Sequence, residues 1–289
     1  MSILLHSTLD LVRKEFALNA PIWTFGHEIN KKELAYLQKE CTTPSEFDPQ
    51  NRRHNMYQNM VDGISKVVKG TCPYGSVIAI LEHPTQMDHI PWELWGRILR
   101  LYTEDGHPPF TMFFLANTHL RMFPSGKQPI TPHNINGGYT YPCNRQTIVI
   151  YRAEDATRVL LHELMHSCCL DNPKLDVDRV EAATEAWAEL MYVGLLSQGV
   201  EREFMTLLHM QSNWMIKQDA IVKKHMQNPE SMEFPWRYTI GKEKLWRKWN
   251  ILVDTPMAHI VVGHSLRLTC PPSKAIKSKF HVSKESTIL

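Results

Sequence analysis

The stretch Leu160–Ser167 reads LLHELMHS and places two histidines around a glutamate at the spacing H-E-x-x-H. In an α-helix, residues four apart differ by about 40° in azimuth and about 6 Å in height. His162 and His166 are therefore expected to project side by side from one face of a helix. Glu163 lies about 100° round from His162, close enough to reach a water on a shared metal ion without ligating the metal itself. The alternative without a metal is a pair of hydrogen-bonded histidines on an ordinary helix.

The composition narrows the class of protein. The chain has 289 residues, of which 43% are apolar and 21% charged, and its formal net charge is +2. These values are typical of a globular protein and exclude a disordered one. A charge so close to neutral predicts no nucleic-acid partner. No apolar run reaches the roughly 20 residues of a membrane span.

The cysteines and the N-terminus bear on the compartment. The six cysteines form no C-x-x-C pair, which argues against a zinc ribbon and against a disulfide scaffold. Cys168 and Cys169 follow the second histidine, but free cysteines usually behave as buried thiols. Charged residues from Asp10 onward interrupt the N-terminal apolar run, so no secretory signal is expected. We therefore predict reduced cysteines and a cytoplasmic protein.

Periodicity and turn residues predict helices first, then strands, then helices again. Asn30 and Glu33 have the spacing of a capping box within a helical N-terminal segment, residues 1–70. Strands are expected at 75–83, 110–117, 136–142 and 147–151, and helices at 91–106, 153–170, 176–198, 201–227 and 241–253. This order predicts an α+β fold with a mixed β-sheet.

The same order divides the chain into four parts. Residues 1–70 are expected to pack on the catalytic domain, and residues 71–172 to form an α+β lobe with an edge strand and the H-E-x-x-H helix. Residues 173–273 are expected to form a mostly α-helical lobe. Residues 274–289 are basic and predict a loosely held tail.

A third metal ligand would make the motif a more specific sign of a zinc site. The metzincin continuation requires Gly at position 169 and His at position 172, where this chain has Cys169 and Asn172. The next predicted helix offers Glu181, Glu185 and Glu189, which form one stripe along one helical face. Of these three, we expect Glu181 to lie on a solvated face.

H-E-x-x-H followed by eighteen residues and a glutamate resembles the gluzincin pattern of thermolysin-like and membrane-alanyl-aminopeptidase-like zinc peptidases. Eighteen residues separate His166 from Glu185, so the resemblance implies that Glu185 is the third ligand. It also implies that Glu189 supports a ligand histidine. The resemblance covers about residues 136–190, with Thr184 and Glu189 in place of the family's Asn and Asp.

The resemblance implies a zincin-like two-lobed fold. In zincin peptidases an antiparallel edge strand before the motif helix binds the substrate backbone by strand addition. Residues 136–142, NGGYTYP, hold that place, with Gly137, Gly138 and Tyr139 as candidate substrate-binding residues above a cleft. The G-x-M-E-N element of aminopeptidases is absent there, which argues against cleavage at a free amino terminus. Whether the protein is an endopeptidase or an exopeptidase is left open.

The expected cofactor is one Zn²⁺ per chain, held by the two histidines and Glu185 with an open position for water. Zinc lowers the pKa of bound water toward ~7, and Glu163 takes the proton as general base. Gluzincins stabilise the oxyanion with a Tyr or His from the helical lobe, and Tyr238 is our candidate for this role. The alternatives are His209, His225, His259 and His264.

These residues predict a zinc metallopeptidase that acts on a peptide or protein substrate. Two other functions stay open: a zincin-fold binding or structural module that retains zinc without turnover, and a zinc hydrolase for a different amide or ester. The intact Glu163 argues against the module, because a site without turnover needs no base. The oligomeric state is left open.

Overall fold

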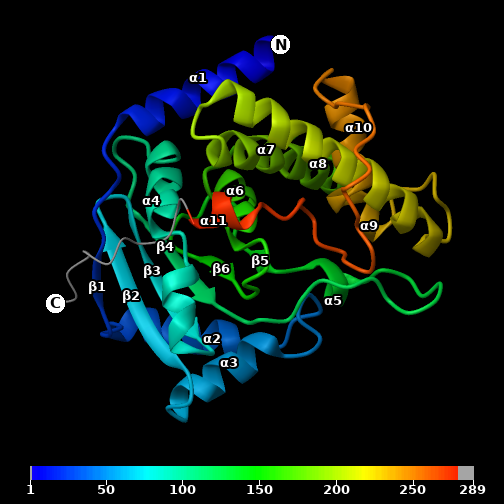
Figure 1. Ribbon diagram of the computed structural model, residues 1–289. Helices are drawn as coiled ribbons and strands as arrows, with labels where there is room; N and C mark the ends of the chain where they lie inside the picture. Colours follow the sequence, from blue (N-terminus) through cyan, green and yellow to red (C-terminus); the bar gives the residue numbers. More distant parts are fainter. Residues whose placement is uncertain (1, 279–289) are drawn as a thin grey trace. The chain divides into compact units, whose positions relative to one another are not determined.

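The computed structural model describes residues 2–278, which form a mixture of α-helices and one mixed six-stranded β-sheet (Figure 1). The predicted α+β class is thereby confirmed. The chain divides into two compact units. The helical unit comprises Met1–Leu18, Leu120–Ile135 and Leu170–Pro271, and the sheet unit comprises Asn19–His119, Asn136–Cys169 and Pro272–Leu289.

The sheet unit holds all six strands, in the order β1-β2-β3-β4-β6-β5. The strands are β1 Thr24–Gly26, β2 Lys66–Cys72, β3 Gly75–Leu81, β4 Phe110–Leu115, β5 Gly138–Tyr139 and β6 Ile148–Ile150. The central pairs β3–β4 and β4–β6 are parallel, and the outer pairs are antiparallel. Strand β5 therefore lies at one edge of the sheet, as the sequence predicted for this segment.

Helices cover both faces of this sheet (Figure 1). The helices of this unit are α2 Lys31–Thr42, α3 Arg52–Val61, the 3₁₀ helix η1 Pro84–His89, α4 Trp92–Leu101, α6 Ala156–Ser167 and α11 Lys274–Ser278. Leu37 of α2 and Met56 of α3 pack with Ile78 and Phe113 in one core cluster. On the opposite face, Trp95 of α4 packs edge-on against Phe114. The alternation of strand side chains produces these two cores from neighbouring residues.

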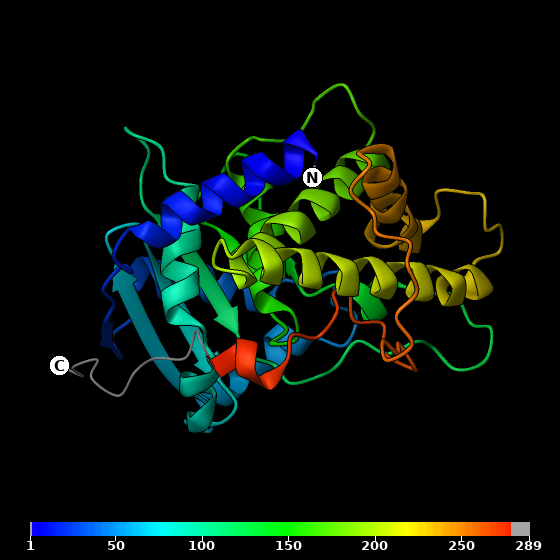
Figure 2. The same ribbon diagram turned by 45° about the horizontal axis from the view of Figure 1, so that its top comes forward.

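The helical unit contains the long helices that follow the motif. Its elements are α1 Ile3–Ala17, α5 Pro132–Ile135, α7 Val177–Leu196, α8 Glu201–Val222, η2 Lys223–His225, α9 Phe234–Tyr238 and α10 Ile240–Lys248. Figures 1 and 2 both show α7 and α8 alongside one another. The indole of Trp246 on α10 donates to the Ala186 carbonyl of α7, 3.0 Å away. Gly241 packs so tightly that an added Cβ would lie 2.7 Å from Ala182.

The largest departure from the predicted elements is in residues 1–70. The capping box of Asn30 and Glu33 begins α2 as predicted, but the segment also contains β1 and most of β2. Gly70, the last residue of the segment expected to be helical, lies within β2, where an added Cβ would be 2.7 Å from the Trp92 ring. β2 forms a strand because it pairs with β3, and β3 lies outside the stretch from which the helix was predicted.

Two further predictions concern the ends and the membrane. Residues 274–278 of the predicted tail form α11, and residues 279–289 lie outside the described residues. Within residues 2–278, no helix combines the length and the apolar composition that a membrane span requires.

Candidate metal centre

Helix α6 carries both motif histidines on one face, as the sequence predicted. Their Nε2 atoms lie 3.0 Å apart, with the ring planes inclined at 74°. Two ligand atoms at ~2.0–2.1 Å from a tetrahedral zinc ion lie roughly 3.3 Å apart. The two imidazoles therefore fit a shared zinc ion.

A carboxylate completes a set of three donors. Among the described His, Cys, Asp and Glu side chains, ligand atoms of His162, His166 and Glu181 lie within 4.8 Å of one another. Two imidazole nitrogens and one carboxylate oxygen match the donors of catalytic zinc sites. Glu185, the third ligand implied by the resemblance, lies one turn further along α7 and is not in this group. Glu185 stays the third ligand that the resemblance implies, and Glu181 is a second candidate.

Glu189 is completely buried and is held inside the helical unit. Its carboxylate accepts hydrogen bonds from Lys242 Nζ at 3.0 Å and from Thr269 Oγ1 at 2.5 Å. Lys242 also donates to the Leu268 carbonyl. These contacts give Glu189 a structural role that links α7 to α10 and to the segment around Thr269. Its predicted support of a ligand histidine stays a prediction.

Tyr238 lies close to the acidic face of α7. It is the last residue of the short helix α9. Burial, together with the charges of Glu181 and Glu185, raises the pKa of its hydroxyl above the usual range. The phenol is therefore protonated at neutral pH and available as a hydrogen-bond donor.

The alternative histidines have other surroundings. His225 Nδ1 is 2.9 Å from the Gln128 carbonyl, and its ring stacks on Phe123. His209 Nε2 contacts the Thr255 carbonyl. His259 and His264 are exposed. We keep Tyr238 as the candidate, because the charges of the α7 residues Glu181 and Glu185 act on its hydroxyl.

Glu163 is buried on α6 beside the edge strand. A Cβ added to Gly138 would lie 3.3 Å from Glu163 Oε1 and 2.6 Å from a methyl carbon of Val159. Only a glycine therefore lets the strand backbone come this close to the predicted base. The sheet unit thus brings together three of the predicted site features: the histidine pair, the glutamate and Gly138.

The backbone polar groups of Gly138 point away from the sheet. The Tyr151 N–H donates to the Gly137 carbonyl at 2.8 Å, and Gly138 is paired opposite Ile150. In an antiparallel pair, hydrogen-bonded and non-bonded residue pairs alternate. Gly138 is consequently in a non-bonded pair, with its N–H and C=O directed toward the outer edge of β5. That orientation is the one an added strand requires.

One prediction about the cysteines was wrong. Cys143 and Cys169 form a disulfide, with Cα atoms 4.8 Å apart, whereas all six cysteines were expected to be reduced. Cys41, Cys72 and Cys168 are free thiols. The pairing joins the turn after β5 to the end of α6, where the Cys143 N–H also donates to the His166 carbonyl at 2.9 Å. Twenty-six positions separate the two cysteines, and only the folded chain brings them together.

Comparisons with known proteins add no relative. No protein-family model, no curated protein and no solved structure matches this chain. The function of the chain is therefore inferred from its own side chains and backbone.

Proposed function

We propose that this chain is a zinc-dependent peptidase in which His162, His166 and Glu181 bind one zinc ion. The observation that supports it most is the grouping of these three donors, with Glu163 next to His162 on α6. This assignment replaces Glu185 by Glu181 in the ligand set implied by the gluzincin resemblance. The proposed fold is zincin-like, with the sheet unit and the helical unit as its two lobes.

The bound zinc ion would supply Lewis acidity that makes a water molecule reactive near neutral pH. Glu163 accepts the proton of that water and then delivers it to the leaving amine. Tyr238, kept protonated by its surroundings, donates to the oxygen on which negative charge develops. Each step uses a side chain whose chemical form suits it.

The outer edge of β5 suits an extended peptide. Gly138 presents its N–H and C=O to that edge, and its missing side chain leaves the substrate backbone close to Glu163. A peptide added as an antiparallel strand would gain main-chain hydrogen bonds at this position. This geometry favours a peptide substrate over a small ester, which has no extended backbone.

Metal analysis and a peptide assay test the proposal together. Purified protein should contain about one zinc ion per chain and should cleave members of a mixed peptide library, and a chelator should abolish the cleavage. Zinc without cleavage would support the non-catalytic module. Cleavage of a simple ester but of no peptide would support the other zinc hydrolase. Absence of bound zinc after reconstitution would refute the proposal.

Glu163→Gln separates metal binding from chemistry. The amide keeps the shape of the side chain but cannot accept the proton. We expect full zinc content, similar substrate affinity, and a kcat lowered by roughly 10²–10⁴, the range typical of lost general-base catalysis. Normal turnover would show that Glu163 is not the base, and loss of zinc would show that it is a ligand.

A further inference from the structure

Strand β5 needs support beyond its own pairing. It consists of two residues, Gly138 and Tyr139, and it pairs with β6 alone among the described strands. So short a strand with one neighbour is not stable by its backbone hydrogen bonds, and Gly138 contributes no side-chain packing. The turn after β5 is joined to α6 by the Cys143–Cys169 disulfide, but within the strand itself only Tyr139 has a side chain that can anchor it.

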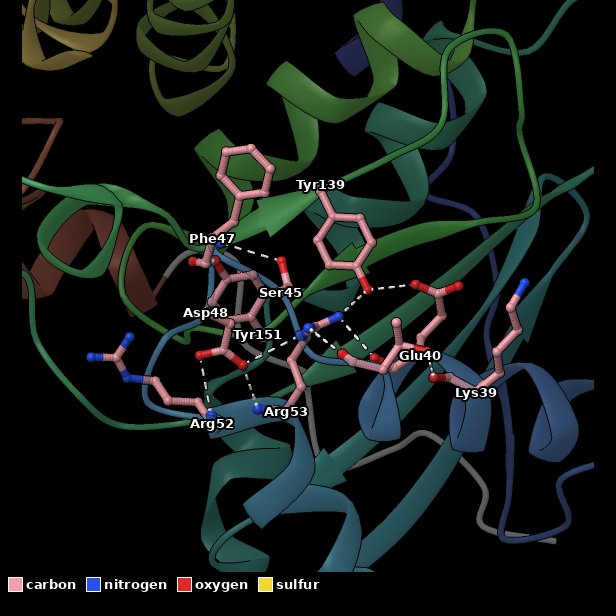
Figure 3. A network of polar contacts seen from close by, with 10 residues as sticks. Lys39, Glu40, Ser45, Phe47, Asp48, Arg52, Arg53, Tyr139 and Tyr151 are labelled. Carbon is pink, nitrogen blue, oxygen red and sulfur yellow. Dashed lines mark hydrogen bonds and ion pairs between the residues drawn. The ribbon is translucent and has the colours of Figure 1, made fainter.

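Tyr139 anchors β5 to the opposite face of the sheet. Successive side chains of a strand point to opposite faces, so Gly138 faces α6 and Tyr139 faces α2 and α3. The Tyr139 hydroxyl accepts a hydrogen bond from Arg53 Nη1 at 2.7 Å and donates to Glu40 Oε2 at 2.8 Å (Figure 3). Burial, and then the hydrogen bond to Glu40, raise the pKa of this phenol. The phenol therefore keeps its proton and donates it in the hydrogen bond to Glu40.

Arg53 is itself held rigidly. It is only 5% exposed. Its Nε donates to Asp48 Oδ2 at 3.3 Å, its Nη1 to the Glu40 carbonyl at 2.8 Å, and its Nη2 to the Thr43 carbonyl at 3.2 Å (Figure 3). A guanidinium that bonds through a planar fork fixes direction as well as distance. Its partner Tyr139 is therefore tied to α2, α3 and the loop that joins them.

We propose that Arg53, Glu40 and Tyr139 are positioning residues that hold Gly138 where an extended peptide is presented to Glu163. The inference rests on the proposed peptidase function, and it goes beyond it by assigning a task to three residues on the far side of the sheet. It also changes the predicted role of Tyr139. Its hydroxyl is occupied by Arg53 and Glu40, so it contributes to substrate binding through the position of β5.

The test compares Tyr139→Phe with Tyr36→Phe as a matched control. Tyr36 lies in the same layer, with its ring 4.9 Å from that of Phe113, but on α2 rather than on β5. Hydrogen–deuterium exchange should be roughly 10–100-fold faster for residues 136–141 in Tyr139→Phe. That factor matches the ~1.5–3 kcal/mol of a hydrogen bond to a charged group. The control should exchange as the wild type does.

Kinetics then show whether this mobility affects binding. In Tyr139→Phe we expect KM to rise about tenfold for a long peptide, with little change for a short blocked peptide that cannot add a strand. The value of kcat and the zinc content should hardly change. Glu40→Gln keeps an oxygen acceptor for the phenol, so it should cause a smaller rise than Tyr139→Phe. Equal effects on long and short peptides would overturn the positioning role.

The exchange measurement also stands without activity. Unchanged exchange of residues 136–141 in Tyr139→Phe would refute the inference even if the enzyme cleaves peptides. Faster exchange in a protein that cleaves nothing would refute the proposed function and leave the anchoring of β5 established. The two failures are thus distinguishable.

Discussion

Replacing Gly138 by alanine tests the geometry of the edge strand most directly. The added Cβ would lie 2.6 Å from a methyl carbon of Val159, 3.0 Å from the Val149 carbonyl oxygen and 3.3 Å from Glu163 Oε1. The first distance is far inside ordinary van der Waals contact, and the Val149 carbonyl belongs to backbone that cannot rotate away. Either β5 or α6 must therefore move.

The expected loss of stability is that of an overpacked core, about 1–3 kcal/mol. In a chain of this size, it should lower Tm by roughly 2–10 °C. Activity should fall further than stability, because the displaced elements carry both Glu163 and the peptide-binding edge. We expect a decrease of at least ~10²-fold in kcat/KM at full zinc content, since misplacement by about 1 Å has that effect.

Two variants make this prediction sharp. Gly26→Ala is the control: Gly26 ends β1 at the other edge of the same sheet, and an added Cβ meets no atom within 4 Å. It should leave Tm and activity unchanged. Val159→Ala combined with Gly138→Ala removes the shortest contact and should restore Tm more than activity. A Gly138→Ala protein with wild-type Tm and wild-type kcat/KM would refute the close approach of β5 to Glu163.

Three other predictions follow from the helical unit. Glu181→Ala should lose most of the zinc while Glu185→Ala retains it, as measured by metal analysis; the reverse result would restore the ligand set of the gluzincin resemblance. Tyr238→Phe should keep zinc content and Tm but lower kcat by ~10²–10³, the effect of one lost oxyanion donor, with KM little changed; wild-type rates would make it a packing residue. The pKa of Asp219 is raised well above its usual value, first by burial and then by Glu243, which forms a hydrogen bond with it and repels its negative charge. A carboxyl with a raised folded-state pKa loses stability as pH rises from its unfolded value, about 3.9, to its folded value. Asp219→Asn should therefore raise Tm by an amount that grows with pH across that window, and a gain independent of pH would contradict this reasoning.

Local sequence signals predicted much of the framework. The apolar runs predicted the three central strands, because a strand buried on both faces is apolar throughout. The Asn30 and Glu33 capping box marked the start of α2 correctly, since both partners of a cap lie within four residues. The signals failed for β1, β2 and the Cys143–Cys169 disulfide, where the partner lies elsewhere in the chain.

The same distinction between local and long-range signals applies to the candidate site. The spacing of His162, Glu163 and His166 determined their relation by itself, because helical geometry alone places residues four apart on one face. The stripe of Glu181, Glu185 and Glu189 left its third ligand undecided, because all three share a face and differ only in height along the axis.

Tertiary structure placed other residues that the stripe left open. It directed Glu189 to Lys242 and brought Tyr238 near Glu181 and Glu185. It also tied Tyr139 to Arg53, 86 positions away. The sequence by itself thus determined the motif helix and the chemical types of its residues. The third ligand and the support of the edge strand depend on the distances between segments far apart in the chain, which only packing establishes.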